Sequence, residues 1–146
     1  MSVFTKTISL RWSDLDPNFH LRHSIYYDLG SQHRIEILES LGLTTEVMHK
    51  QHFGPILFRE ECVFKKEIRM KDVVTIHTKI AKMRSDGGRW TIQHEFINQD
   101  EKSCTLLTVD GAWMDVIHRK LANPTPDLAL HVLNSIPKAD DFILFD

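Results

Sequence analysis

The sequence has no long apolar run and no excess of positive charge. A membrane-spanning helix needs about 20 consecutive apolar residues, and the longest apolar stretches here are far shorter. The 18 Lys and Arg residues stand against 20 Asp and Glu residues, for a net charge of -2. Binding to nucleic acid or to an anionic membrane through bulk charge needs a concentrated basic surface. We therefore expect no nucleic-acid partner and no membrane span.

Cysteine is also scarce. Cys62 and Cys104 are the only two, and they are too far apart in the sequence to form a close metal-binding pair. The first twelve residues, MSVFTKTISLRW, alternate between polar and apolar and lack the continuous apolar centre of an export signal. We expect reduced, buried thiols in a cytoplasmic protein.

The composition is that of an ordinary globular protein. Of the 146 residues, 42% are hydrophobic and 26% are charged, enough to form one core. No internal repeat or low-complexity linker divides the chain. We therefore expect a single domain, residues 1–146.

A strand followed by a long helix is expected in the first third of the chain. Residues 3–12 alternate between polar and apolar side chains, with Lys6 as the exception, which is typical of a half-buried strand. Residues 24–41 predict a helix, with Ser24 as its N-cap and Gly42 just past its end. Its apolar residues spread over more than one narrow stripe, which predicts neighbours on several sides.

The remaining chain is rich in strand patterns. Turn-forming residues separate the segments, at SDGG (85–88) and at NQDEK, and NPTPD breaks the pattern before a short helix at 128–133. Four strands are expected, at 56–68, 73–83, 89–98 and 104–117. Long strands joined by tight turns form an antiparallel meander. One apolar helix beside such strands predicts an α+β fold in which an antiparallel sheet wraps around one long central helix.

The loop between the first strand and the helix concentrates polar side chains. Asp14, Asp16 and Asn18 match the start of a calcium loop, but Phe19 and Ile25 occupy the positions where such a loop needs Gly and Glu. Two histidines three residues apart do not complete a zinc site either. The loop therefore does not predict a metal site.

A catalytic role for this loop rests on Asp16. Pro17 biases the backbone of Asp16 towards an extended conformation, and the helix that follows has unpaired N–H groups at its positive end. A carboxylate that faces free helix amides can carry out acyl transfer, because the amides stabilise an oxyanion while the carboxylate attacks or activates water. Caps and turns before a helix use the same residue types, so the residues alone leave both interpretations open.

The loop and the order of elements resemble the hotdog-fold thioesterases of the 4-hydroxybenzoyl-CoA thioesterase type. The motif is Asp14-Leu15-Asp16, followed by Phe19-His20-Leu21-Arg22-His23 and by Tyr26 on the helix, and the resemblance spans residues 3–116. It implies a hotdog fold, with Asp16 as the catalytic nucleophile or general base. It also implies that the oxyanion donor is the backbone N–H of His23, or that of Ser24 one residue later.

The resemblance carries further expectations about substrate and assembly. It implies hydrolysis of an acyl-CoA, or alternatively of an acyl carrier protein thioester, by a homodimer or homotetramer with active sites at the subunit interface. No metal or redox cofactor is required, because coenzyme A is part of the substrate. We expect the substrate-binding residues to be His20, Tyr26, Phe19, Arg84 and Arg89.

These residues have separate expected roles. His20 orients the loop or forms a structural hydrogen bond, and Tyr26 reaches the acyl pocket. Phe19 stands where the family commonly has glycine and narrows the loop or closes over the acyl group. Arg84 and Arg89 flank the SDGG turn and are candidates to hold the phosphates of coenzyme A. Glu60, which interrupts an apolar strand face, is a second candidate acid.

Two other functions use the same fold. Hotdog hydratases carry a motif of the form D-x-N-P-x-H, whereas this chain has Asp16-Pro17-Asn18-Phe19-His20 and places it before the long helix. The other alternative is a non-catalytic acyl-CoA-binding protein, because a fold does not determine function. Binding without release of the thiol would distinguish it from a thioesterase.

Overall fold

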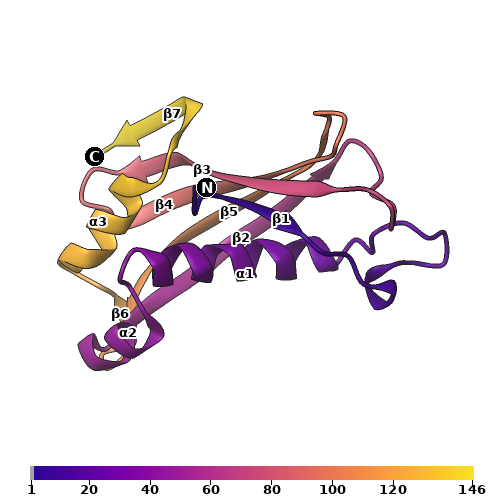
Figure 1. Ribbon diagram of the computed structural model, residues 1–146. Coiled ribbons are helices and arrows are strands. Elements are labelled where there is room, and N and C mark those ends of the chain that lie inside the picture. The colour runs from indigo at the N-terminus through magenta and orange to yellow at the C-terminus, as the bar shows by residue number, and fades with distance from the viewer. Residues whose placement is uncertain (1) are drawn as a thin grey trace.

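The computed structural model describes residues 2–146 as one curved sheet with a long helix lying across it (Figure 1). A short 3-10 helix, Trp12–Asp14, precedes the main helix. The helices are α1 (Ile25–Ser40), α2 (Thr45–Gln51) and α3 (Asp127–Ser135). The strands are β1 (Thr5–Ile8), β2 (Phe53–Phe64), β3 (Val74–Arg84), β4 (Arg89–Ile97), β5 (Ser103–Asp115), β6 (Lys120–Leu121) and β7 (Lys138–Phe145).

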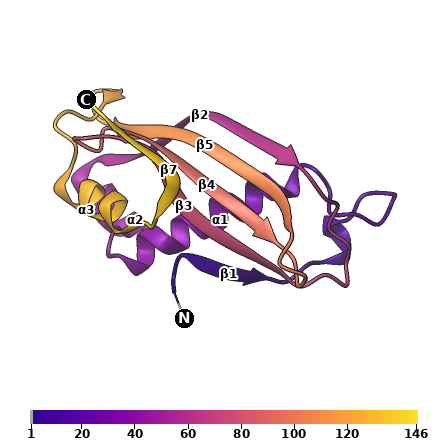
Figure 2. The same cartoon turned by 90° about the horizontal axis from the view of Figure 1, so that it is seen from above.

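The sheet has the strand order β1-β3-β4-β5-β2 (Figure 2). All of these neighbours pair antiparallel, and β6 adds a short antiparallel pairing to β5. β2, which precedes β3 in sequence, therefore lies at the far edge of the sheet, beside β5. This arrangement confirms the predicted antiparallel sheet around one long helix.

The C-terminal segment was not expected to form a strand. β7 runs parallel to β3 and occupies the part of the β3 edge that β1 leaves free, since β1 pairs with residues 74–77 and β7 with residues 80–84. Two segments from opposite ends of the chain thus share one edge. Because β7 pairs with a strand far away in the sequence, the residues around it carry little local signal of a strand.

Several boundaries differ from the prediction. The first strand ends at Ile8 rather than at Trp12, and the Trp12 side chain is 70% exposed. Ser24 precedes α1 but makes no capping hydrogen bond, because its hydroxyl accepts from the Arg22 guanidinium instead. Helix α2 was not predicted; Thr44 caps it by accepting from the backbone N–H of Val47.

Helix α1 buries one stripe against the sheet. The fully buried side of the helix consists of Ile25, Tyr26, Gly30, His33 and Ile37, and the last four follow the three- and four-residue spacing of a helix face. Other apolar residues, such as Leu29 and Leu38, are only partly buried. These residues still pack against the core, so the structure of one chain does not contradict the predicted neighbours on several sides of α1.

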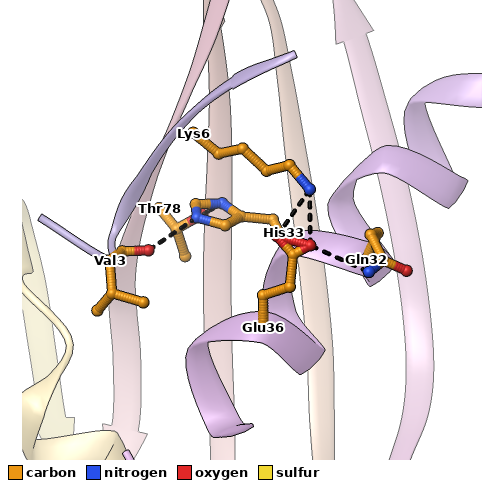
Figure 3. A network of polar contacts seen from close by, with 6 residues as sticks. All are labelled: Val3, Lys6, Gln32, His33, Glu36 and Thr78. Atoms are coloured by element: carbon orange, nitrogen blue, oxygen red, sulfur yellow. Dashed lines mark hydrogen bonds and ion pairs between the residues drawn. The ribbon is translucent and has the colours of Figure 1, made fainter. Parts of the chain in front are cut away.

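A row of buried polar side chains connects α1 to the sheet (Figure 3). Nε2 of His33 lies 3.0 Å from the carbonyl oxygen of Val3, and its Nδ1 lies 2.8 Å from the hydroxyl of Thr78. That hydroxyl is also 2.6 Å from Nδ1 of His94, whose Nε2 is 3.0 Å from a guanidinium nitrogen of Arg34.

The two ends of this row determine the direction of each hydrogen bond. The carbonyl of Val3 only accepts, so Nε2 of His33 donates and Nδ1 accepts from the hydroxyl of Thr78. Nδ1 of His94 must then donate to Thr78, which leaves Nε2 to accept from Arg34. Both histidines are neutral in this arrangement. Burial agrees with it, since desolvation lowers the pKa of His33 and holds the pKa of His94 well below 6.5.

The charged residue inside the first strand has a partner on α1. The ammonium group of Lys6 lies 2.6 and 2.7 Å from the two carboxylate oxygens of Glu36, which also accepts from Gln32 at 3.0 Å (Figure 3). This pair explains the position at which the alternation of residues 3–12 fails. The pair is about one-third exposed, so it adds little to stability.

Gly111 allows three strands to approach closely. It lies on β5 opposite Trp90 of β4 and Leu57 of β2. A Cβ atom at this position would lie 2.7 Å from the carbonyl oxygen of Ile56 and in the ring of Trp90. The Trp90 ring therefore occupies the space that a side chain at position 111 would need.

No helix within residues 2–146 is long and apolar enough to cross a membrane.

We expect Gly111→Ala to destabilise the protein by about 1–3 kcal/mol, because the new methyl group overpacks the core against backbone. Gly54→Ala is the matched control, since a Cβ atom there meets no other atom within 4 Å. Urea unfolding of both variants measures the difference. Equal stability of the two variants would contradict this account of Gly111.

The neutral His94 is expected to make stability depend on pH. Its pKa is lowered by burial from 6.5, so below that pH the unfolded chain takes up a proton that the folded chain refuses. Stability is therefore complete above pH 6.5 and is lost as the pH falls below it, by up to about 1.4 kcal/mol per pH unit for one group.

Urea unfolding at pH 7.5, 6.5 and 5.5 tests this expectation. His94→Gln should give a smaller loss of stability between pH 6.5 and 5.5 than the wild type, whatever its stability at pH 7.5. His49→Gln, which changes an exposed histidine on α2, is the control and should keep the wild-type slope. An unchanged slope in His94→Gln would show that the histidine is not held neutral.

Candidate functional site

The first aspartate of the loop holds the loop in place. Asp14 is 3% exposed, and its carboxylate accepts from the guanidinium of Arg11 at 2.9 and 3.3 Å and from the Arg11 backbone N–H at 3.0 Å. The hydrogen bond from the Arg11 side chain lowers the pKa of Asp14. The Asp14 carbonyl also accepts from the Arg22 N–H at 2.7 Å. Asp14 is therefore an anchor between the two ends of the loop.

The second aspartate is arranged differently. One carboxylate oxygen of Asp16 accepts from the backbone N–H groups of Asn18 at 2.8 Å and His20 at 3.1 Å. Its backbone N–H donates to the carbonyl of His20 at 2.8 Å, which closes a tight turn. Within residues 2–146 the other carboxylate oxygen, Oδ2, accepts no hydrogen bond. Asp16 is thus fixed in position but keeps one oxygen available.

The turn owes its shape to one unusual residue. Phe19 has a φ of 63°, in the left-handed region that non-glycine residues adopt infrequently. Its backbone N–H donates to the Asp16 carbonyl at 2.9 Å. Leu21, which follows the turn, donates to the Ile68 carbonyl at 2.7 Å and is 4% exposed. The turn is therefore anchored on the β2–β3 connection.

Asp16 lines a surface hollow of about 350 Å³ at the start of α1. Three of the other predicted site residues, His20, His23 and Tyr26, also line it. The remaining lining residues are Leu21, Phe64, Lys65, Lys66 and Glu67. The fold thus brings together four of the seven residues that the sequence predicted.

The backbone at the start of α1 has free donors beside this carboxylate. Neither the N–H of His23 nor that of Ser24 donates to a protein acceptor in the described chain, whereas Ile25 donates to the Arg22 carbonyl at 3.0 Å. The His23 side chain is exposed. The hollow is therefore lined by Asp16, whose carboxylate is partly free, and by His23, whose backbone N–H is unpaired in the described chain. A carboxylate and a free amide are the two groups that acyl transfer uses.

Tyr26 forms an inner wall of the hollow. It is 2% exposed and packs edge-on against Phe64 and Phe96, with ring centroids 5.2 Å apart in both pairs. Burial raises its pKa to about 12, and the nearby charge of Asp16 adds to the shift. The phenol therefore stays protonated at neutral pH.

The other predicted residues are placed less favourably. His20 is half-buried, and its Nε2 lies 3.4 Å from the carboxylate of Glu67. Phe19 is 61% exposed and packs against Trp12 with ring centroids 5.8 Å apart, outside the lining of the hollow. In this conformation it does not close over the space beside Asp16.

Arg84 and Arg89 lie on either side of the β3–β4 turn, at the end of the sheet away from the Asp16 loop (Figure 1). The Arg84 guanidinium is 2.8 Å from Asp86, and that of Arg89 lies 4.9 Å from the ring of Phe58. One chain therefore does not bring them together with Asp16. Their role in binding coenzyme A stays a prediction that needs a second copy of the chain.

Two lysines at the hollow were missed. Lys65 and Lys66 follow β2 directly, and both donate their backbone N–H to the Cys104 carbonyl, at 2.9 and 3.0 Å. Two adjacent cations at a strand end are a visible signal, but nothing in the sequence indicates that this end lies against the Asp16 loop. Glu60, the second candidate acid, is exposed two residues after the bulge at Phe58. It does not line the hollow.

The described residues contain no group of three or more His, Cys, Asp or Glu side chains that could hold a metal ion.

The chain is similar to known proteins in sequence and in fold. Residues 10–132 match the thioesterase-like superfamily. No curated protein sequence matches the chain.

Solved structures match over most of their length. A Staphylococcus aureus hypothetical protein characterised in complex with CoA has a TM-score of 0.82 and 18% identity, covering 93% of this chain and 87% of that one. A 1,4-dihydroxy-2-naphthoyl-CoA thioesterase from Synechocystis has a TM-score of 0.79 and 14% identity, covering 90% and 96%. A gentisyl-coenzyme A thioesterase has a TM-score of 0.73 and 20% identity, covering 90% and 99%.

Similarity at these identities establishes the hotdog fold, as the sequence motif predicted. The family match covers most of the chain and includes the whole Asp16 loop and α1. The chain therefore belongs to the thioesterase-like superfamily.

Proposed function

We propose that the protein is an acyl-CoA thioesterase, in which Asp16 is the nucleophile or general base and the backbone N–H of His23 stabilises the oxyanion. The observation that carries this proposal is the hollow that Asp16 and His23 line together. Membership of the superfamily supports the reaction class. An acyl carrier protein thioester is the alternative substrate.

The proposed chemistry uses a carboxylate and a backbone N–H of the protein, the thioester and water. As a nucleophile, the Asp16 carboxylate attacks the thioester carbon and expels the thiolate of coenzyme A, and water then hydrolyses the resulting anhydride. As a general base, Asp16 instead takes a proton from the water that attacks the same carbon. In both routes negative charge develops on the carbonyl oxygen, where a free N–H at the start of α1 stabilises it.

The walls of the hollow suit the two parts of an acyl-CoA. The protonated, largely buried Tyr26 borders the acyl side with an aromatic surface. Lys65 and Lys66 provide positive charge for the phosphates of coenzyme A. The CoA complex of the Staphylococcus aureus relative supports a nucleotide-bearing ligand. We propose these two lysines as phosphate-binding residues within the same chain as Asp16.

The exposed edge of β2 supports the proposed homo-oligomer. Within residues 2–146, β2 pairs only with β5, so its other edge has free backbone groups. An exposed edge strand that carries apolar side chains is a pairing surface. The exposed apolar residues of β2 are Leu57, Phe58, Val63 and Phe64. Pairing of two copies along this edge would also bring a second Arg84 and Arg89 into the assembly.

We expect Asp16→Asn to lower kcat by about 10²–10⁴-fold, the usual contribution of a catalytic acid or base. The amide oxygen of asparagine still accepts from the N–H groups of Asn18 and His20, so the turn persists. Thiol release from short, medium, long and aromatic acyl-CoAs measures the effect. Aromatic substrates are included because two structural relatives are described as a 1,4-dihydroxy-2-naphthoyl-CoA thioesterase and a gentisyl-coenzyme A thioesterase.

Glu60→Gln is the matched control, because it neutralises the rival carboxylate outside the hollow and should leave turnover unchanged. Circular dichroism of both variants checks that the fold persists. Loss of turnover in Glu60→Gln alone would move the chemistry to that residue. Stabilisation of the wild type by acyl-CoA without any thiol release would support a binding protein instead.

A further inference from the structure

A second cavity, of about 450 Å³, lies beside the far half of α1. It shares no lining residue with the Asp16 hollow. From His23 to Arg34 the chain advances about 16 Å along the helix axis, at 1.5 Å per residue. The walls of this second cavity are mainly apolar and include Ile35, Leu38, Ile92, Trp113, Leu133 and Ile136. Its volume is in the range of small-molecule binding sites.

The charged residue in this wall is Arg34. No carboxylate in the described chain forms an ion pair with it, and the charge of Glu60 only partly offsets the burial that lowers its pKa. An arginine side chain nevertheless remains protonated in proteins. Arg34 is partly buried, and a partly desolvated positive charge without an ion-pair partner is unfavourable. An anionic ligand would reduce that cost.

The donors around the cavity outnumber the acceptors. Arg34 has five N–H groups, and its one hydrogen bond to protein goes to His94, whose neutral ring can only accept at that nitrogen. The Thr78 hydroxyl is fully used by His33 and His94. The remaining N–H groups of Arg34 are therefore the unpaired charged donors in an otherwise mainly apolar wall.

We propose that this cavity binds a carboxylic acid with an apolar body, whose carboxylate pairs with the Arg34 guanidinium. The guanidinium fork matches the geometry of a carboxylate, and the apolar walls enclose an alkyl or aromatic body. Glu60, whose charge acts on Arg34, is exposed on β2 and forms no ion pair with the guanidinium in the described chain. Within one chain the cavity shares no lining residue with the Asp16 hollow, and binding there does not depend on turnover.

Calorimetric titration with octanoate and 1-naphthoate, each beside its neutral amide, tests this proposal. The wild type should bind the carboxylates about tenfold to a hundredfold more tightly than the amides, the range expected for a hydrogen-bonded charged group. Arg34→Met should abolish this preference while retaining the apolar contacts. Lys79→Met, which removes a positive charge from an exposed position next to Thr78, should leave both affinities unchanged.

Two further variants keep the test decisive if Arg34→Met does not fold. Arg34→Lys keeps the positive charge but loses the guanidinium fork, and should retain a weaker preference for the carboxylates over the amides. Asp16→Asn should bind octanoate as the wild type does. Equal affinities for acid and amide, or loss of binding in Asp16→Asn, would overturn the proposal. Failure of thioesterase activity alone would leave it standing.

Discussion

The contact between α1 and the sheet is the constraint on which the rest of the structure depends. Gly30 lets the helix approach so closely that a Cβ atom there would meet Leu107 and lie 3.2 Å from His94. Beside it, the buried row from His33 through Thr78 to His94 must satisfy every polar atom. A shift of the helix along the sheet would leave these groups unpaired. The row therefore determines one register, and with it the position of both ends of α1.

The two ends of the helix then acquire different chemistry. At the N-terminal end, free backbone N–H groups lie beside the hollow that contains Asp16. Further along the helix, Arg34 brings a positive charge to an apolar cavity. Because the two positions are separated along α1, the Asp16 carboxylate and the Arg34 guanidinium line different cavities. The rigidity of the connection comes from the polar row between them.

Two aspartates in the same motif have opposite roles because burial differs between them. Asp14 is closed off from solvent and is fully engaged by Arg11, which stabilises its charged form. Asp16, two residues later, is held by backbone amides through one oxygen only. Asp14 holds the conformation of the loop, and the loop in turn holds Asp16 in position. The motif D-x-D thus contains, side by side, a fully engaged carboxylate and one that keeps an oxygen free within the described chain.

The sequence by itself determined the features that depend on local patterns. Alternation located β2 to β5 to within a few residues, and the motif around Asp16 identified the loop whose hollow also contains His20, His23 and Tyr26. Tertiary structure alone decided the rest: the parallel pairing of β7 with β3, the position of Lys65 and Lys66, and the cavity at Arg34. Each of these joins segments far apart in the chain. Local propensity and periodicity act over a few residues, whereas such contacts depend on how the sheet curves around the helix.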